Sequence, residues 1–159
     1  MRFKYFAFLT TLISLTVNAI EIYPQVSSKI IEIKAVNTQV EQGEVVIRLD
    51  DRQAQLELQH LEVLQSIKQQ AFDDKQLELQ QTQELFDRMV SSHRDVEIAK
   101  LEFNAAKREL DAHNLKIEIA KLELEKFQIK SPISGTVKSL PNIRNATNIN
   151  SAKVLMIIE

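Results

Sequence analysis

The sequence predicts an α+β protein in which a long antiparallel coiled-coil hairpin of two helices is inserted into one small β domain. Residues 51–127 contain no Gly and no Pro, although the chain has 2 Gly and 3 Pro elsewhere, and both residues disfavour helix interiors. The second half of this segment repeats its apolar side chains at alternating steps of three and four, which is typical of helices packed lengthwise. The flanking segments, 26–50 and 128–159, are instead rich in β-branched residues.

The first 19 residues have the pattern of a secretory signal peptide. Arg2 and Lys4 precede an apolar run from Phe6 to Val17, and Ala19 supplies a small residue for cleavage. The run has about twelve residues, too few for a helix across a hydrocarbon core of about 30 Å. We therefore expect the rest of the chain to lie outside the cytoplasm; an uncleaved membrane anchor is the alternative.

Charge and cysteine content narrow the possible functions. The formal net charge is −2, and residues 51–127 carry 16 Asp and Glu against 11 Lys and Arg, so this segment would repel nucleic-acid phosphates. The chain has no Cys, which excludes disulfides, thiolate zinc sites and a lipid-modified cysteine anchor. We therefore predict no nucleic-acid partner and no thiol chemistry.

Residues 20–50 should supply the first half of the β domain. Lys29–Val36 has the composition of a strand. In a second strand at 45–49, Val45, Ile47 and Leu49 should point one way and Val46 and Arg48 the other. Gly43 lies between these strands, where a tight turn with positive φ favours glycine.

The first helix of the hairpin is expected from about Asp51 to Arg88. Asp50 and Asp51 are suitable N-cap residues, and the ten Gln between positions 53 and 83 favour helix. The apolar track of this helix is incomplete. Its members are Leu58, Leu61, Phe72, Leu79, Phe86 and Met89, and its polar interruptions are Gln65, Lys68, Lys75 and Thr82.

A turn at 89–93 should separate this helix from the second, which is expected to end near Lys126. Ser92 is a candidate N-cap, and a carboxylate at Asp95 complements the helix dipole. So short a turn favours an antiparallel hairpin. The seam of the second helix comprises Val96, Ala99, Phe103, Ala106, Leu110, His113, Ile117, Ala120, Leu124 and Phe127. Burial of one apolar stripe offsets little of the entropy cost of ordering the backbone of the rod. We therefore expect contacts with neighbouring helices to stabilise it.

After Phe127 the sequence returns to strand character. We expect short strands at Ile129 and at Gly135–Leu140, a polar loop over Asn142–Asn150 and a last strand over Val154–Ile158. Neither β half can bury a core alone, and an antiparallel hairpin begins and ends at the same place. The two halves should therefore meet at the base of the hairpin and complete one domain.

Three stretches, in this order, resemble the periplasmic adaptor proteins, also called membrane fusion proteins or the haemolysin secretion D family. Residues 26–51 are similar to the first half of the family's lipoyl domain. Residues 84–88 and 92–99 are similar to the tip of its helical hairpin. Lys130–Val137 is similar to the second lipoyl half, which typically reads x-A-P-x-x-G-x-V. The resemblance covers nearly all of residues 26–159.

The resemblance implies a split lipoyl/biotinyl-like domain at 26–50 plus 128–159 with a helical hairpin at 51–127, and it places Gly43 and Gly135 in the lipoyl-like turns. It also implies a periplasmic adaptor subunit of a tripartite efflux or secretion system. Such a subunit links an inner-membrane transporter, of RND or ABC type, to an outer-membrane channel protein. Adaptors assemble as a ring or funnel, so a homo-oligomer is expected.

Tips in this family carry an Arg, Leu and Ser triplet at the spacing R-x3-L-x6-S. Leu85 and Ser92 match the last two positions, whereas Gln81 replaces the Arg by a shorter, neutral amide. The resemblance therefore implies channel contact by Gln81, Leu85 and Ser92, together with their neighbours Arg88 and Met89.

The ends of the chain depart from the family pattern. Adaptors normally add a β-barrel domain, and often a membrane-proximal domain, outside the lipoyl halves, but only residues 20–25 lie between the expected signal peptide and the first half. We expect a minimal adaptor, a truncated gene product or half of a split protein. The alternative function is a stand-alone coiled-coil scaffold, or a degenerate adaptor fragment without a role in transport.

The sequence contains no constellation for catalysis, for a metal or for a cofactor. His60, His93 and His113 are far apart, and no metal-ligand spacing links them to one another. A lipoylated or biotinylated lysine would need a β turn, but the one Asp-Lys dipeptide, Asp74-Lys75, lies inside the predicted helix. We therefore predict that the protein is not an enzyme and binds no cofactor.

Overall fold

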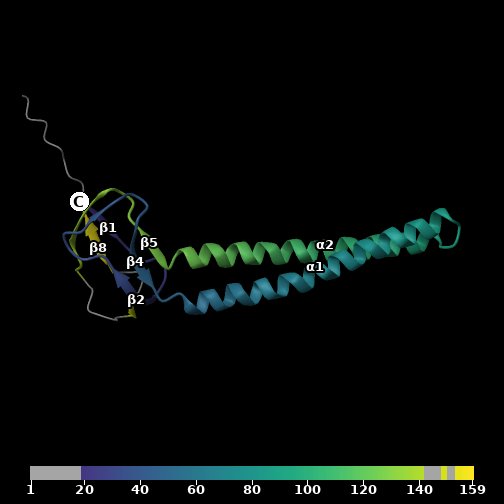
Figure 1. Cartoon of the computed structure of the whole chain (residues 1–159), viewed down its shortest axis with the longest axis horizontal. Coiled ribbons are helices and arrows are strands. Elements are labelled where there is room, and N and C mark those ends of the chain that lie inside the picture. The colour runs from purple at the N-terminus through teal and green to yellow at the C-terminus, as the bar shows by residue number, and fades with distance from the viewer. Residues whose placement is uncertain (1–18, 142–147, 150–152) are drawn as a thin grey trace, which may run out of the picture.

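Two long helices form a rod that projects from a small β domain, as the computed structural model shows (Figure 1). The structure describes residues 19–141, 148–149 and 153–159, so the predicted signal peptide lies almost wholly outside the described residues. Within the described ranges, neither helix combines the length and the apolar character needed to cross a membrane.

The helices of the rod are α1 (Arg52–Asp87) and α2 (His93–Glu125). Their ends lie within one residue of the predicted ones, because no Gly or Pro interrupts them. The two helices pack along their length as an antiparallel pair (Figure 1). The rings of Phe72 and Phe103 meet near the middle, with centroids 5.4 Å apart.

In the described residues, the β domain consists of two four-stranded sheets. In one sheet the order is β1-β8-β6-β3, and in the other it is β5-β4-β2-β7. Each sheet takes two strands from the chain before the hairpin and two from the chain after it. The strands are β1 (Ile20–Ile22), β2 (Ser28–Ile33), β3 (Gln39–Val40), β4 (Val45–Leu49), β5 (Gln128–Lys130), β6 (Gly135–Ser139), β7 (Asn148–Ile149) and β8 (Met156–Ile158). The predicted fold class, a split β domain with an inserted hairpin, is therefore confirmed.

The core of the β domain is shared equally between the two halves of the chain. Buried aliphatic side chains from both sides of the hairpin form one cluster, so neither half has a core of its own. Its members are Ile22, Ile30, Val40, Val46, Ile47, Leu49, Ile129, Val137, Ile149, Leu155, Met156 and Ile158.

Three strands were not predicted, and one side chain faces the wrong way in the prediction. β1 and β3 are only two or three residues long, and β7 lies inside the predicted loop 142–150, of which residues 142–147 and 150 fall outside the described residues. Val46 is buried like its neighbour Ile47. The pairing of β4 with β5 shifts register between Val45 and Ile47, and such a bulge places consecutive side chains on one face.

The hairpin is joined to one side of a sheet, through the edge strand β5 and its neighbour β4. β4 continues into α1, α2 continues into β5, and β4 and β5 are themselves paired, with Arg48 opposite Gln128. The Leu49 N–H donates to the Phe127 carbonyl oxygen at 2.9 Å, and the Asp50 N–H donates to the Lys29 carbonyl oxygen at 2.8 Å. Both helices are therefore anchored at their first or last turn.

The predicted N-cap of α1 is only partly correct. Asp51 occupies the N-cap position, but its side chain makes no capping hydrogen bond. The Asp50 carboxylate instead accepts from the Arg52 N–H at 3.3 Å and from the Arg52 guanidinium at 2.8 and 2.6 Å. These hydrogen bonds lower the pKa of Asp50 to about 2.

Candidate interaction site at the hairpin tip

The turn between α1 and α2 begins with a Schellman motif, in which one residue with a left-handed backbone ends the helix. The Val90 N–H donates to the Leu85 carbonyl oxygen at 2.8 Å, and the Met89 N–H donates to the Phe86 carbonyl oxygen at 2.8 Å. In this motif the residue just beyond the C-cap takes a left-handed conformation and is usually Gly. Here that residue is Met89, with φ 60.

Met89 combines an unfavourable backbone with an exposed apolar side chain. A left-handed conformation costs an L-residue about 1–2 kcal/mol relative to its usual conformations, and Asn or Gly would relieve most of that cost. The Met89 side chain is 95% exposed, so no packing within the hairpin compensates. The left-handed backbone closes the Schellman end of α1, whereas the exposed side chain has no packing partner in the hairpin, which makes Met89 a candidate contact residue.

Other apolar side chains surround Met89 at the end of the rod. Val90 is 68% exposed, and Leu85 and Phe86 are each 40% exposed. The Phe86 ring also meets the His93 ring edge-on, with centroids 6.2 Å apart. An exposed apolar cluster of this kind is a candidate surface for contact with another protein.

The second helix begins with a complete capping box. The Asp95 N–H donates to Ser92 Oγ at 3.3 Å, and the Ser92 N–H donates to Asp95 Oδ2 at 2.8 Å. Ser92 Oγ also donates to Asp95 Oδ2 at 2.6 Å. The hydrogen bond from the Ser92 hydroxyl lowers the pKa of the Asp95 carboxyl. The predicted cap is confirmed, and the Ser92 hydroxyl is engaged within its own turn.

The structure places the predicted tip residues at different heights. Arg88 and Met89 lie in the turn itself, and Leu85 and Ser92 lie on the helix ends that flank it. Gln81 is exposed one turn farther down α1. Phe86 and Val90 also lie at the tip, although neither is among the predicted channel-contact residues. Phe86 belongs both to the stretch 84–88, which resembles the family's tip, and to the predicted apolar track, and α1 ends at the next residue.

Three of the four polar interruptions of the α1 track have side-chain partners on α2; the fourth, Thr82, donates from Oγ1 to the Glu78 carbonyl oxygen within α1 at 2.8 Å. Gln65 Nε2 donates to Asn114 Oδ1 at 2.9 Å, and Lys68 Nζ lies 2.8 Å from Glu109 Oε2. Lys75 Nζ lies 2.5 Å from Glu102 Oε2. These cross-helix contacts hold the two helices in one register.

Four residues of the α2 seam are buried. His113 is buried and contacts the Leu61 carbonyl oxygen through Nε2 at 2.8 Å. Three apolar seam residues, Ala99, Leu110 and Ile117, are also buried. The other predicted seam residues are half-buried; they are Val96, Phe103, Ala106, Ala120, Leu124 and Phe127.

The two predicted glycines have different roles. Gly43 lies in a turn with φ 84, as expected, and its N–H donates to the Ser131 carbonyl oxygen at 2.8 Å. Gly135 is the first residue of β6 rather than a turn residue, and a Cβ there would lie 2.5 Å from the Glu159 carbonyl oxygen. The second glycine is therefore required by close approach of backbone, not by a turn.

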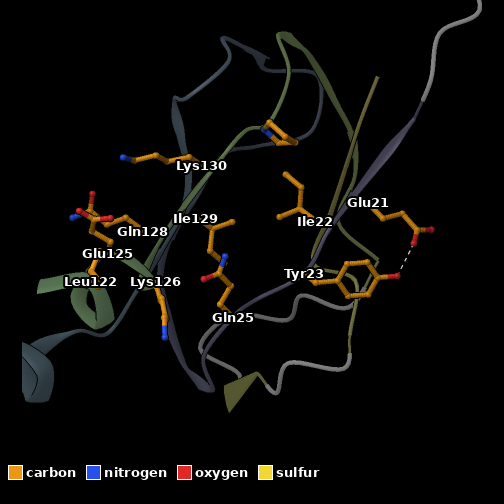
Figure 2. A pocket seen from close by; sticks show the side chains of 11 residues that line it. Glu21, Ile22, Tyr23, Gln25, Leu122, Glu125, Lys126, Gln128, Ile129 and Lys130 are labelled. Atoms are coloured by element: carbon orange, nitrogen blue, oxygen red, sulfur yellow. Dashed lines mark hydrogen bonds between the residues drawn. The ribbon is translucent and has the colours of Figure 1, made fainter. Parts of the chain in front are cut away.

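A hollow of about 480 Å³ lies where α2 enters the β domain. Ile22 and Ile129 line its middle, and the polar side chains lie around them without converging on one point (Figure 2). On one side Tyr23 Oη donates to Glu21 Oε2 at 2.7 Å. Across the described residues there is no cluster of His, Asp and Glu that could hold a metal ion.

The structure of this chain is similar to several solved structures. With the membrane fusion protein Spr0693 from Streptococcus pneumoniae R6, the TM-score is 0.67 at 15% identity, over 89% of this chain and 59% of that one. With the periplasmic adaptor protein EmrA the TM-score is 0.61 at 13% identity, over 89% of this chain and 72% of that one. With MacA from Actinobacillus actinomycetemcomitans the TM-score is 0.54 at 24% identity, over 90% of this chain and 49% of that one. No family model matches the chain, and no curated protein matches it in sequence.

These similarities extend across the hairpin and the β domain together. They cover about nine-tenths of this chain but only about half to three-quarters of the length of the three proteins. At such low identity the shared property is the fold. The chain therefore has the fold of the periplasmic adaptor proteins, or membrane fusion proteins, with a split lipoyl-like β domain and an inserted helical hairpin.

Proposed function

We propose that this protein is a non-enzymatic periplasmic adaptor subunit of a tripartite efflux or secretion system. Its hairpin tip would contact an outer-membrane channel protein, and its β domain would face an inner-membrane transporter of RND or ABC type. Several copies would act together. Support comes from the shared fold and from the tip, which carries the apolar surface that such a contact requires.

The observation that carries the proposal is the backbone and side chain of Met89. Its left-handed φ belongs to the Schellman end of α1, but its 95% exposure leaves a large apolar side chain without a packing partner in the hairpin. That exposure is explained if the Met89 side chain enters an apolar pocket between helices of a partner. Methionine suits such a contact because its flexible, polarizable side chain adapts to irregular surfaces.

The remaining tip residues would surround this contact. Leu85, Phe86 and Val90 would add apolar area, and the Arg88 guanidinium would contact carboxylates or carbonyl oxygens at the rim. The Ser92 hydroxyl is already engaged with Asp95, so its contribution would be to hold the turn in shape. Gln81, which stands in the position of the family's Arg, would contact the channel farther from the tip through its amide.

Site-specific photo-crosslinking tests the proposal. A photoreactive phenylalanine analogue replaces Met89 in the tagged chain, which is expressed in its own host and irradiated in intact cells. We expect an adduct with an outer-membrane channel protein. The matched control places the same group at Glu118, which is exposed on α2 far from the tip. Absence of the adduct, or an equal adduct from position 118, contradicts channel contact at the tip and favours the stand-alone scaffold.

A further inference from the structure

Methionine sulfur occurs at two places in the described part of the chain, and the two differ completely in exposure. The chain has three Met and no Cys, and Met1 lies outside the described residues. Met89 is 95% exposed at the hairpin tip, whereas Met156 is 0% exposed in the core of the β domain. Oxidation of sulfur side chains follows their exposure. A mild oxidant in solution should therefore reach Met89 and not Met156.

The protection of Met156 comes from its place in the sheet. Its strand, β8, lies between β1 and β6, and Met156 is paired with Ile22 of β1. Its side chain belongs to the shared core, together with Leu155 and Ile158. An oxidant can reach this sulfur only when the β domain opens. Oxidation of Met156 would thus report unfolding, and oxidation of Met89 would report the native surface.

The fold of the tip does not use the Met89 side chain. The end of α1 is held by backbone, because the Met89 N–H donates to the Phe86 carbonyl oxygen at 2.8 Å. The start of α2 is held separately, by the capping box of Ser92 and Asp95. A chemical change confined to the Met89 side chain therefore leaves both helix ends intact and alters only the surface that the tip presents.

That surface is apolar, and oxidation would place a polar group at its centre. Leu85, Phe86 and Val90 supply exposed apolar area around Met89. Methionine sulfoxide is polar, unlike the thioether from which it forms. Burial of a polar group without a hydrogen-bond partner is unfavourable. An apolar partner surface that accepts the thioether would therefore bind the sulfoxide less tightly.

We propose that Met89 is a redox-sensitive modification site, at which oxidation of the thioether to the sulfoxide releases the tip from its partner. With hydrogen peroxide, the sulfur gives up two electrons and forms one S–O bond as the O–O bond breaks, and the products are the sulfoxide and water. Methionine sulfoxide reductases reverse the step. They take two electrons from a dithiol, which becomes a disulfide, and the oxygen leaves as water. The effect on binding rests on the proposed function, whereas the selectivity between the two Met does not.

Peptide mapping after oxidation tests the selectivity. The full chain is treated with hydrogen peroxide and then cleaved with trypsin, which cuts after Arg88, Arg94 and Lys153 and so leaves each Met in its own peptide. We expect the Met89 peptide to gain oxygen about tenfold faster than the Met156 peptide, with unchanged helix content by circular dichroism. In concentrated urea the two rates should converge. Equal rates in the folded chain would overturn the proposal.

Capture from envelope extracts tests the effect on binding. The tagged chain is used untreated, after oxidation and removal of the peroxide, and after repair by methionine sulfoxide reductases with a dithiol. Both reductases, MsrA and MsrB, are included because each acts on one epimer of the sulfoxide. We expect oxidation to lower recovery of an outer-membrane channel protein about tenfold and repair to restore it. Recovery that stays low after complete repair would contradict a reversible switch.

Two leucine variants assign the effect to one sulfur. Recovery by Met89→Leu, whatever its level before treatment, should not change on oxidation, because no thioether remains at the tip. Met156→Leu, a volume-conserving change in the core, should lose recovery as the wild type does. An equal loss in Met89→Leu would overturn the proposal.

The two proposals fail in different ways in this experiment. An untreated chain that captures no channel protein would contradict the adaptor function, and the switch with it. Capture that is present but unchanged by oxidation of Met89 would contradict the switch alone.

Discussion

At the scale of single residues, Met89 has a left-handed backbone that the surrounding sequence does not predict. The amino-acid pattern around it predicts a turn but gives no Gly or Asn to signal a left-handed residue. The backbone nevertheless adopts φ 60 there and closes both hydrogen bonds of the Schellman end. The sequence could therefore locate the tip and its neighbours but not the strained position within it.

Met89→Gly should separate stability from function. Glycine adopts the left-handed conformation without strain, so we expect the free energy of unfolding to rise by about 1 kcal/mol. The same change removes the exposed side chain, so capture of the channel protein should fall. Chemical denaturation and affinity capture from envelope extracts measure the two effects. Met89→Leu is the control: it keeps an apolar side chain and the strain, and should keep both properties near the wild-type level.

Gly135→Ala should destabilise the β domain. Its Cβ would lie 2.5 Å from the Glu159 carbonyl oxygen, which is held in place because it accepts from the Thr136 N–H at 2.6 Å. Since the Cβ is fixed to the backbone of β6 and the oxygen belongs to the backbone of residue 159, the strands must shift, and we expect a loss of about 1–3 kcal/mol. Thermal unfolding followed in the far ultraviolet measures it. Ser134→Ala, one residue earlier and exposed, should lose much less, and equal losses would contradict this reasoning.

At the scale of elements, the stability of the hairpin depends on its helix ends, and its register depends on polar contacts within its seam. Gln65, Lys68 and Lys75 look like defects in a sequence of apolar repeats, but each has an α2 partner. Such pairs select one register at some cost in stability. The helices themselves were predictable, because continuous 3/4 spacing and the absence of Gly and Pro act locally. The partners of the polar seam residues were not, since they depend on the level of the other helix.

Ser92→Ala should weaken the start of α2. The change leaves the Asp95 N–H without its side-chain acceptor and removes the hydroxyl that donates to the Asp95 carboxylate. Loss of an N-cap of this type costs about 1 kcal/mol. Urea denaturation should show this difference, with the slope unchanged. Ser91→Ala is a suitable comparison, because Ser91 Oγ donates to the Thr82 carbonyl oxygen and does not cap α2; a larger loss there would argue against the capping box.

The protein should lose stability in acid. The pKa of Asp50 is lowered to about 2 by Arg52, and Lys34 and Lys68 lower the pKa values of Glu44 and Glu109. A carboxyl with a lower pKa in the folded state adds stability that is complete above its unfolded pKa, which is about 4. That stability is lost as pH falls from about 4 towards 2. Melting temperatures across this range should decline.

The Asp50→Asn variant identifies one source of the acid response. Because it has no carboxylate to protonate at position 50, its melting temperature should depend less steeply on pH between about 4 and 2. Asp111→Asn on the exposed surface of α2 is the matched change and should keep the wild-type slope. If both variants follow the wild type, the Asp50–Arg52 contact contributes nothing to the response.

At the scale of the whole molecule, the β domain is assembled from segments that are far apart in the sequence. The prediction of one domain from two halves followed from the antiparallel hairpin, which returns the chain to its starting point. The strands β1, β3 and β7 escaped prediction because two or three residues carry no periodicity. Their existence depends on distant partners, as in the pairing of Ile20 with Ile158. The burial of Val46 likewise depends on a register shift with β5.

Removal of the rod should leave the β domain folded. Arg48 and Gln128 lie opposite each other in the β4–β5 pair, so a short turn containing Asn-Gly can replace residues 51–126. The shared core lies entirely in the retained segments. Dispersed amide resonances and a cooperative thermal transition are the expected results. A spectrum typical of an unfolded chain would show that the rod is needed to bring the two halves together.

The direct continuation of β4 into α1 and of α2 into β5 makes the rod a mechanical lever. α1 has 36 residues and is therefore about 54 Å long. A tilt of about 5° in the β4–β5 pair would displace the tip by about 5 Å, close to one helical turn. Both arms of the lever insert into neighbouring strands, so a pull on the tip loads the backbone hydrogen bonds of that pair together. A change of strand angle in the β domain would thus reach the far end of the hairpin as a movement large enough to open or close a contact between helices.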